Sequence, residues 1–116
     1  MSYHTCYSLE IIGASRADQE SIFDMLEDLG VLRYALQRES GTEYGTYEPC
    51  NWWCHESDML ELSQKHPQVR FTLHGEGECN DDIWESHYLN GKTYTQGAII
   101  TIPPFDPVLL RDPGAA

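Results

Sequence analysis

Histidines, carboxylates and a cysteine gather between positions 74 and 87, and these residue types are the ones best suited to chemistry. The candidate ligands are His74, Glu76, Glu78, Cys79 and His87. Imidazole, carboxylate and thiolate groups bind divalent metals, but this spacing matches no established metal motif. Glu76 and Glu78 would serve as an acid–base pair only if an apolar pocket raised the pKa of one of them. We therefore expect no metal and no catalysis, with a small metal-dependent enzyme using the His74–His87 region as the alternative.

Other patterns in the chain also fall short of known cofactor and catalytic motifs. Gly75 and Gly77 are followed by no Lys-Ser/Thr pair, so they do not form a phosphate-binding loop. The His55-Glu56 pair would need a second histidine at position 59, which is Met59, to match the zinc-protease motif. The spacing of the four cysteines is not that of a zinc site, and we expect them to stay reduced. No cofactor is expected.

Acidity is the dominant global property of the chain. Nineteen Asp and Glu face seven Lys and Arg, for a formal net charge of −12. Such a charge repels nucleic acid and anionic membranes and attracts basic proteins. No apolar run approaches the ~18 residues of a membrane span, and the first residues lack the features of a signal peptide. We expect a cytoplasmic protein with no direct contact to nucleic acid or membrane. Solubility alone is the competing explanation of the charge.

The acidic residues form two sets that contain no base. The first follows helical spacing, and the second spans ten positions around a predicted turn. Rows of carboxylates can imitate the phosphates of nucleic acid and occupy a basic groove, although each set can also be a solvated face. Adjacent Trp52 and Trp53 cannot both point inward on a strand, so we expect one in the core and the other exposed or at an interface. The predicted partner-binding residues are Glu20, Asp24, Glu27, Asp28, Glu76, Glu78, Asp81, Asp82, Glu85 and Trp53.

Hydrophobic periodicity predicts alternating strands and helices in a single domain, 1–116, whose last residues, 111–116, fray. Ser15 is a suitable N-cap and Gly30 a suitable stop for a helix whose apolar stripe includes Phe23. Apolar residues between 105 and 110 are expected to pack on the core. The strands are predicted over 3–12, 31–37, 69–73 and 94–102, and the helices over 16–29, 55–66 and 80–88. Residues 38–47 are predicted to form a turn or loose hairpin, and residues 74–78 a turn.

This order of elements favours an α+β fold with an antiparallel or mixed sheet and two main helices on one face. A ferredoxin-like split βαβ arrangement is the leading topology, because strands and helices alternate in the required order.

The stretch from Trp52 to Phe105 resembles small accessory proteins carried by phages, prophages and plasmids. The similarity rests on a Trp-led helix, a Gly-Glu-Gly-Glu turn, an Ile-Trp segment, Asn-Gly-Lys and a closing strand. It implies a ferredoxin-like fold and a mobile-element setting, and it carries over no catalytic residue. By analogy with anti-CRISPR proteins, we expect an acidic protein that binds and inhibits a basic, nucleic-acid-handling host protein or ribonucleoprotein complex by DNA mimicry. A self-associating structural protein or homodimer is a further alternative.

Overall fold

The computed structural model describes residues 3–30, 32, 34–38, 41–46 and 49–114 of the chain. Within these residues, six strands and two α-helices form an α+β arrangement, which confirms the expected fold class. A short 3-10 helix, η1, lies near the C-terminus. In chain order the elements are β1 (Thr5–Ile12), α1 (Arg16–Leu29), β2 (Tyr34–Arg38), β3 (Gly41–Gly45), α2 (His55–Lys65), β4 (Arg70–Gly77), β5 (Ile83–Leu89), β6 (Lys92–Gly97) and η1 (Pro107–Leu109).

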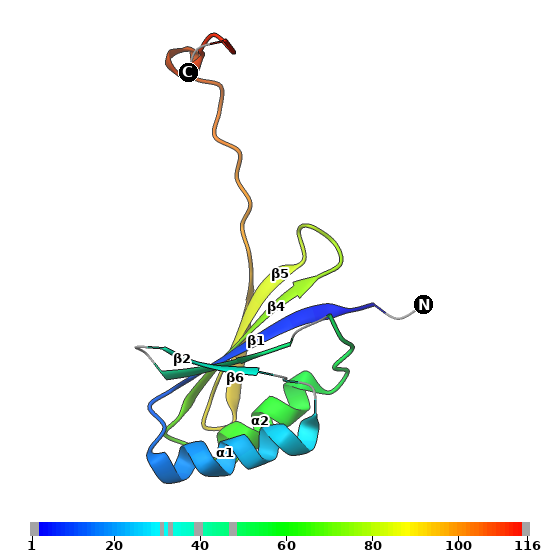
Figure 1. Cartoon of the computed structure of the whole chain (residues 1–116), viewed down its shortest axis with the longest axis vertical. Helices are drawn as coiled ribbons and strands as arrows, with labels where there is room; N and C mark the ends of the chain where they lie inside the picture. The colour runs from blue at the N-terminus through cyan, green and yellow to red at the C-terminus, as the bar shows by residue number, and fades with distance from the viewer. Residues whose placement is uncertain (1–2, 31, 33, 39–40, 47–48, 115–116) are drawn as a thin grey trace.

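The six strands form one antiparallel sheet in the order β2-β3-β1-β4-β5-β6. The connection through α1 joins β1 to β2, and β3 lies between these two strands. The connection through α2 joins β3 to β4, and β1 lies between them. Strands β5 and β6 extend the sheet beyond β4, and both helices lie on the same side of the sheet (Figure 1). No helix of the described residues has the length and apolarity required to cross a bilayer.

Strand β1 shows how the sheet separates a core face from an open face. Its burial alternates residue by residue, with Tyr7, Leu9 and Ile11 buried and Ser8 and Glu10 less buried. Successive side chains of a strand point to opposite faces, so the apolar set faces the helices and the polar set faces away from them. The fully buried part of this core is formed by Leu9, Ile22, Met59, Leu62, Ser63, Val69, Phe71, Leu73 and Tyr88.

Local sequence signals determine α1 from end to end. The hydroxyl of Ser15 accepts a hydrogen bond from the backbone N–H of Asp18 at 3.2 Å. At the other end, Gly30 adopts φ 69° and its N–H donates to the carbonyl of Leu26. A side-chain acceptor at the N-cap and a left-handed glycine after the last turn are the usual ends of a helix. The predicted helix over 16–29 is confirmed.

Two sequence predictions around the second acidic set are wrong. The turn predicted over 74–78 is mostly strand, because β4 continues through Gly77. Most of the short helix predicted over 80–88 is strand β5, which begins at Ile83 and has Ser86 and Tyr88 buried. The Asn90-Gly91 turn, with φ 49° and 76°, joins β5 to β6 as a hairpin. Cross-strand pairing and alternating burial thus prevail over the local helix-capping signal of the preceding acids.

The end of the chain also differs from expectation. The last strand stops at Gly97 instead of 102, and the predicted packing of residues 105–110 on the core is wrong. Phe105, Val108, Leu109 and Leu110 are all exposed. By contrast, the expectation of one buried and one exposed tryptophan is confirmed, since the exposed fractions of Trp52 and Trp53 are 4% and 80%.

A glycine of β4 that pairs with a tryptophan of β5 provides a test of the packing. Gly75 lies opposite Trp84, and a Cβ added there would overlap the indole ring. We expect Gly75→Ala to lower the free energy of unfolding by roughly 1–3 kcal/mol, as overpacked cores do. A Cβ added at Gly97 in β6 meets no atom within 4 Å, so Gly97→Ala is the matched control, expected to stay within about 0.5 kcal/mol. Urea denaturation measures both, and equal effects would contradict the predicted packing.

Candidate functional site

The sheet face that carries no helix presents polar side chains in cross-strand rows. Strand register places residues of β1, β4 and β5 directly opposite one another on this open face. Facing residues of neighbouring strands lie within interaction distance. Two adjacent rows result, Ser8–His74–Glu85 and Glu10–Thr72–His87.

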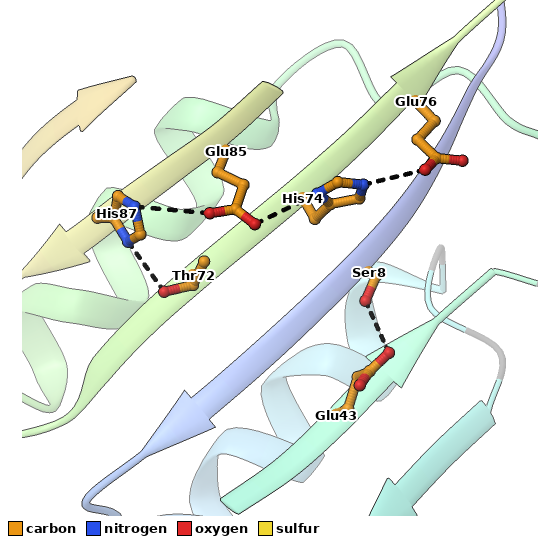
Figure 2. A network of polar contacts seen from close by, with 7 residues as sticks. All are labelled: Ser8, Glu43, Thr72, His74, Glu76, Glu85 and His87. Carbon is orange, nitrogen blue, oxygen red and sulfur yellow. Dashed lines mark hydrogen bonds and ion pairs between the residues drawn. The ribbon is translucent and has the colours of Figure 1, made fainter. Parts of the chain in front are cut away.

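A chain of contacts connects the two histidines of this face (Figure 2). Nε2 of His74 lies 3.2 Å from a carboxylate oxygen of Glu76, and its Nδ1 lies 3.5 Å from Glu85. The other oxygen of Glu85 lies 3.9 Å from Nε2 of His87, whose Nδ1 is 3.0 Å from the hydroxyl of Thr72. Glu85 therefore bridges two imidazoles, and both ring nitrogens of each histidine have a polar neighbour.

The open face is hollowed, but its donors do not converge on a metal. A shallow polar cavity of about 410 Å³ lies between β3 and β5. Among the described residues, no group of three or more His, Cys, Asp and Glu side chains is placed to hold a metal ion. Glu78 and Cys79 follow the end of β4, and Glu78 lies 3.8 Å from His4 instead of His74. The cavity is lined by Ser8, Glu10, Glu43, Arg70, Thr72, His74, Glu85 and His87.

The first acidic set occupies the solvent side of α1. Glu20, Asp24, Glu27 and Asp28 are exposed, while Ile22 and other apolar residues of the helix face the core. No Lys or Arg within the described part of the chain forms an ion pair with these four carboxylates. The four carboxylates of the predicted stripe thus lie on the exposed side of α1, and Arg16 in the first turn is the nearby basic residue that lines the same groove as Glu20 and Asp24.

An exposed aromatic ring lies beside these acids. The sequence pattern assigned Phe23 to the apolar stripe, but its side chain is 46% exposed, and its ring centroid lies 6.5 Å from that of Tyr44 in β3. Burial raises the pKa of Tyr44, so its phenol stays neutral. A groove of about 320 Å³ here, named the α1 groove, is lined by Arg16, Gln19, Glu20, Phe23, Asp24 and Tyr44. Aromatic rings beside carboxylates can bind the side chain of an arginine or lysine.

The second acidic set is divided between two surfaces. Glu76 and Glu85 lie on the open face of the sheet, whereas Glu78 and Asp81 are exposed in the turn after β4. Asp82 accepts a hydrogen bond of 2.6 Å from the Tyr3 hydroxyl, which raises the pKa of Tyr3 to about 12. Asp82 therefore ties the start of the chain to the β4–β5 turn, and the five acids do not form one patch.

An aromatic cavity on the helix side was missed by sequence reasoning. It has a volume of about 390 Å³ and includes the exposed Trp53 in its lining. The ring of His55, the first residue of α2, stacks on that of Trp84, with a distance of 5.2 Å between the ring centroids. Buried Nδ1 of His55 has no hydrogen-bond partner among the described residues. The side chains that line the cavity come from separate segments of the chain. Trp53, predicted from the sequence as a partner-binding residue, was therefore the one indication of this site. Its aromatic lining consists of Tyr3, Tyr7, Trp52, Trp53, His55 and Trp84.

Comparisons with protein families, curated proteins and solved structures found no match to this chain. Its function must therefore be inferred from the open face, the α1 groove and the aromatic cavity.

His55 makes stability depend on pH. Burial lowers its pKa below the ordinary value of 6.5, so the folded state resists protonation. The stability that depends on His55 being neutral is fully present above pH 6.5. It is lost as the pH falls through the folded pKa, because the unfolded chain binds the proton more readily. We expect His55→Phe, which keeps an aromatic ring against Trp84, to reduce the stability lost between about pH 7 and pH 5. Urea denaturation at both pH values measures the difference, and an unchanged loss in the variant would contradict this role.

Proposed function

We propose that this protein is a non-enzymatic binding protein that docks a basic segment of another protein on the outer face of α1. The observation that carries this proposal is the exposed ring of Phe23, which lies in the same groove as Glu20 and Asp24. An arginine or lysine of the partner would contact the aromatic ring and both carboxylates. Such cation–π contacts contribute ~0.5–2 kcal/mol, depending on how far the cation is desolvated.

Solubility accounts poorly for this surface. A helix face that served only to keep the protein dissolved would carry mixed charges and no large exposed aromatic residue. Like charges four residues apart, as at Glu20–Asp24 and Asp24–Asp28, each destabilise a helix by a few tenths of a kcal/mol. The chain therefore tolerates both repulsion and apolar exposure on α1. Binding of a basic segment would neutralise the repulsion between the carboxylates and would cover the exposed ring of Phe23.

The spacing of the acids suits a partner that handles nucleic acid. Glu20, Asp24, Glu27 and Asp28 lie within nine residues, whose eight steps of 1.5 Å cover about 12 Å of helix axis. This corresponds to one charge per ~3–4 Å, close to the one charge per 3.4 Å of a DNA strand. We infer a partner with a basic nucleic-acid groove. The resemblance to mobile-element proteins extends this proposal to inhibition of a host defence protein in the cytoplasm, in the manner of anti-CRISPR proteins.

We also propose that the first four strands and two helices form a ferredoxin-like split βαβ unit. In its support, β3 lies between the strands that α1 connects, and β1 lies between the strands that α2 connects. This is the interleaving that defines a split βαβ motif. Strands β5 and β6 would then be an addition that widens the open face.

Matched charge reversals test the α1 surface against acidity in general. The probe is a fluorescent arginine-rich peptide, titrated with the full chain and followed by anisotropy. Glu20→Lys with Asp24→Lys is expected to weaken binding at least tenfold, because both groove carboxylates are lost. Glu78→Lys with Asp81→Lys makes the same charge change in the exposed β4–β5 turn and is expected to have a much smaller effect. Equal weakening by both pairs would reject a specific site on α1.

The aromatic contribution is tested separately. We expect Phe23→Ala to weaken peptide binding by roughly 2–30-fold, the range that corresponds to a cation–π contact. Thermal denaturation should show that the variant remains folded, since Phe23 is not a core residue. Unchanged affinity in Phe23→Ala would contradict the proposed role of its ring in binding.

A further experiment tests the class of partner. Nucleic-acid-binding proteins should be captured from a host lysate at low salt, and this capture should be lost at high salt.

A further inference from the structure

The C-terminal segment after β6, residues 98–110, here named the tail, leaves the domain as an apolar and exposed chain. Figure 1 shows it running away from the sheet and from both helices. The radius of gyration is 18.2 Å, whereas a compact chain of this length has one of roughly 13 Å. Isolated exposed apolar residues are ordinary, but a run of them indicates an interaction site. Seven are at least 63% exposed, namely Ile99, Ile100, Ile102, Phe105, Val108, Leu109 and Leu110.

Prolines preorganise the centre of the tail. Pro103, Pro104 and Pro107 restrict their own backbone angles and those of the residues before them, so the chain stays extended. The sequence from Pro104 to Pro107 has the Pro-x-x-Pro spacing of segments that dock in aromatic-lined grooves. The carboxylate of Asp106 accepts from the N–H of Val108 at 3.0 Å and fixes the turn into η1. A segment already in its bound conformation loses little entropy on docking.

The aromatic cavity has the chemistry that such a segment requires. Tyr7, Trp52 and Trp84 provide its buried and half-buried walls, with Tyr7 packed edge-on against both tryptophans. Trp53 is 80% exposed, and tryptophan is among the residues that most often anchor protein–protein contacts. None of the ten lining residues carries a carboxylate, ammonium or guanidinium group. In a chain of net charge −12, an uncharged cavity is a place where two copies can meet without repulsion.

The position of the tail favours a second copy over the same molecule. Thr95 lines the cavity, and the tail begins only three residues later. Phe105 lies eight residues after Gly97, a span of up to about 26 Å in extended chain. To place Phe105 in its own cavity, the chain would have to reverse within this short span, whereas Figure 1 shows it extended away from the domain. A second molecule accepts the tail without any reversal.

We propose that two copies of this protein exchange tails, each inserting the segment around Pro104 and Phe105 into the aromatic cavity of the other. Reciprocal insertion is a two-fold, self-complementary arrangement, which is the commonest symmetry of protein dimers. The anchor Phe105 and the residues that line the cavity carry no fixed charge, so the contact persists as salt rises, unlike the charge-led binding at α1. The two surfaces are therefore separable by experiment.

The mass of the full chain in solution tests the exchange. Light scattering or sedimentation of the full chain from about 1 to 100 µM should give twice the 13.3 kDa of one chain at high concentration. The dimer should persist in roughly 0.5 M sodium chloride, where contacts between exposed charges are screened. A chain that stays monomeric over this range would overturn the proposal. A dimer that dissociates in salt would overturn it as well.

Single substitutions on each side of the contact identify the surfaces. Phe105→Ser in the tail and Trp53→Ala in the cavity should each raise the dimer dissociation constant at least tenfold, because each removes an anchor from both contacts. Both positions are exposed, so the fold should be retained. Tyr94→Ser removes an exposed aromatic residue of β6 that lines neither surface and should leave the dimer unchanged. A dimer that resists both test substitutions would exclude this interface.

Mixing the two variants distinguishes exchange from other occupants of the cavity. The Phe105→Ser chain keeps an intact cavity, and the Trp53→Ala chain keeps an intact tail, so the mixture can form one complete contact. It should associate more strongly than either variant alone. Monomeric protein whose tail amides are protected from hydrogen exchange would show docking within one molecule. That result, or binding of only foreign proline-rich peptides, would refute exchange between copies.

Discussion

The antiparallel pairing of β1 with β4 is the constraint on which the other features depend. All eight residues of β1 pair in register with the eight residues of β4. This register sends Leu9 and Leu73 together to the core and Ser8 and His74 together to the open face. Because side chains alternate along a strand, a slip of one residue would exchange the two faces and bury the histidine–glutamate network. The positions of both helices follow from the same register, since they cover the apolar face.

The α1 groove, the open face and the aromatic cavity differ in charge and in aromatic content. The α1 groove combines charge with an exposed ring, the open face combines imidazoles with carboxylates, and the aromatic cavity carries no charge at all. A strongly acidic protein repels copies of itself at every exposed carboxylate. The proposed self-association would use an uncharged surface, while the proposed basic partner would be attracted most strongly at α1. The net charge would then favour a different partner on each of these two surfaces.

Local signals explain which parts of the fold were predictable. Helix α1 was predicted to the residue because Ser15, its apolar stripe and Gly30 act within one short segment. Strand β5 was mistaken for a helix because the acids before it mimic an N-cap, whereas its pairing with β4 and β6 is non-local. The prediction of one buried and one exposed tryptophan was correct, although Trp52 and Trp53 lie in the segment before α2 and not on a strand, so strand alternation is not its cause. The aromatic cavity was not predictable, because Tyr7, His55 and Trp84 meet only when three distant segments fold together.

The tail contributes no buried side chain to the domain, and this separates its evolution from that of the fold. A substitution at Phe105 or Leu109 removes no core contact, so it leaves the folding equilibrium of the domain almost unaltered. Most substitutions in a small protein lower its folding stability, and selection removes those that lower it too far. Residues 98–110 escape this limit, and selection can alter what they bind while β1, β4 and the helices stay fixed. The sequence of the tail can therefore change quickly on a scaffold that changes slowly, and any contact that the tail makes can change with it.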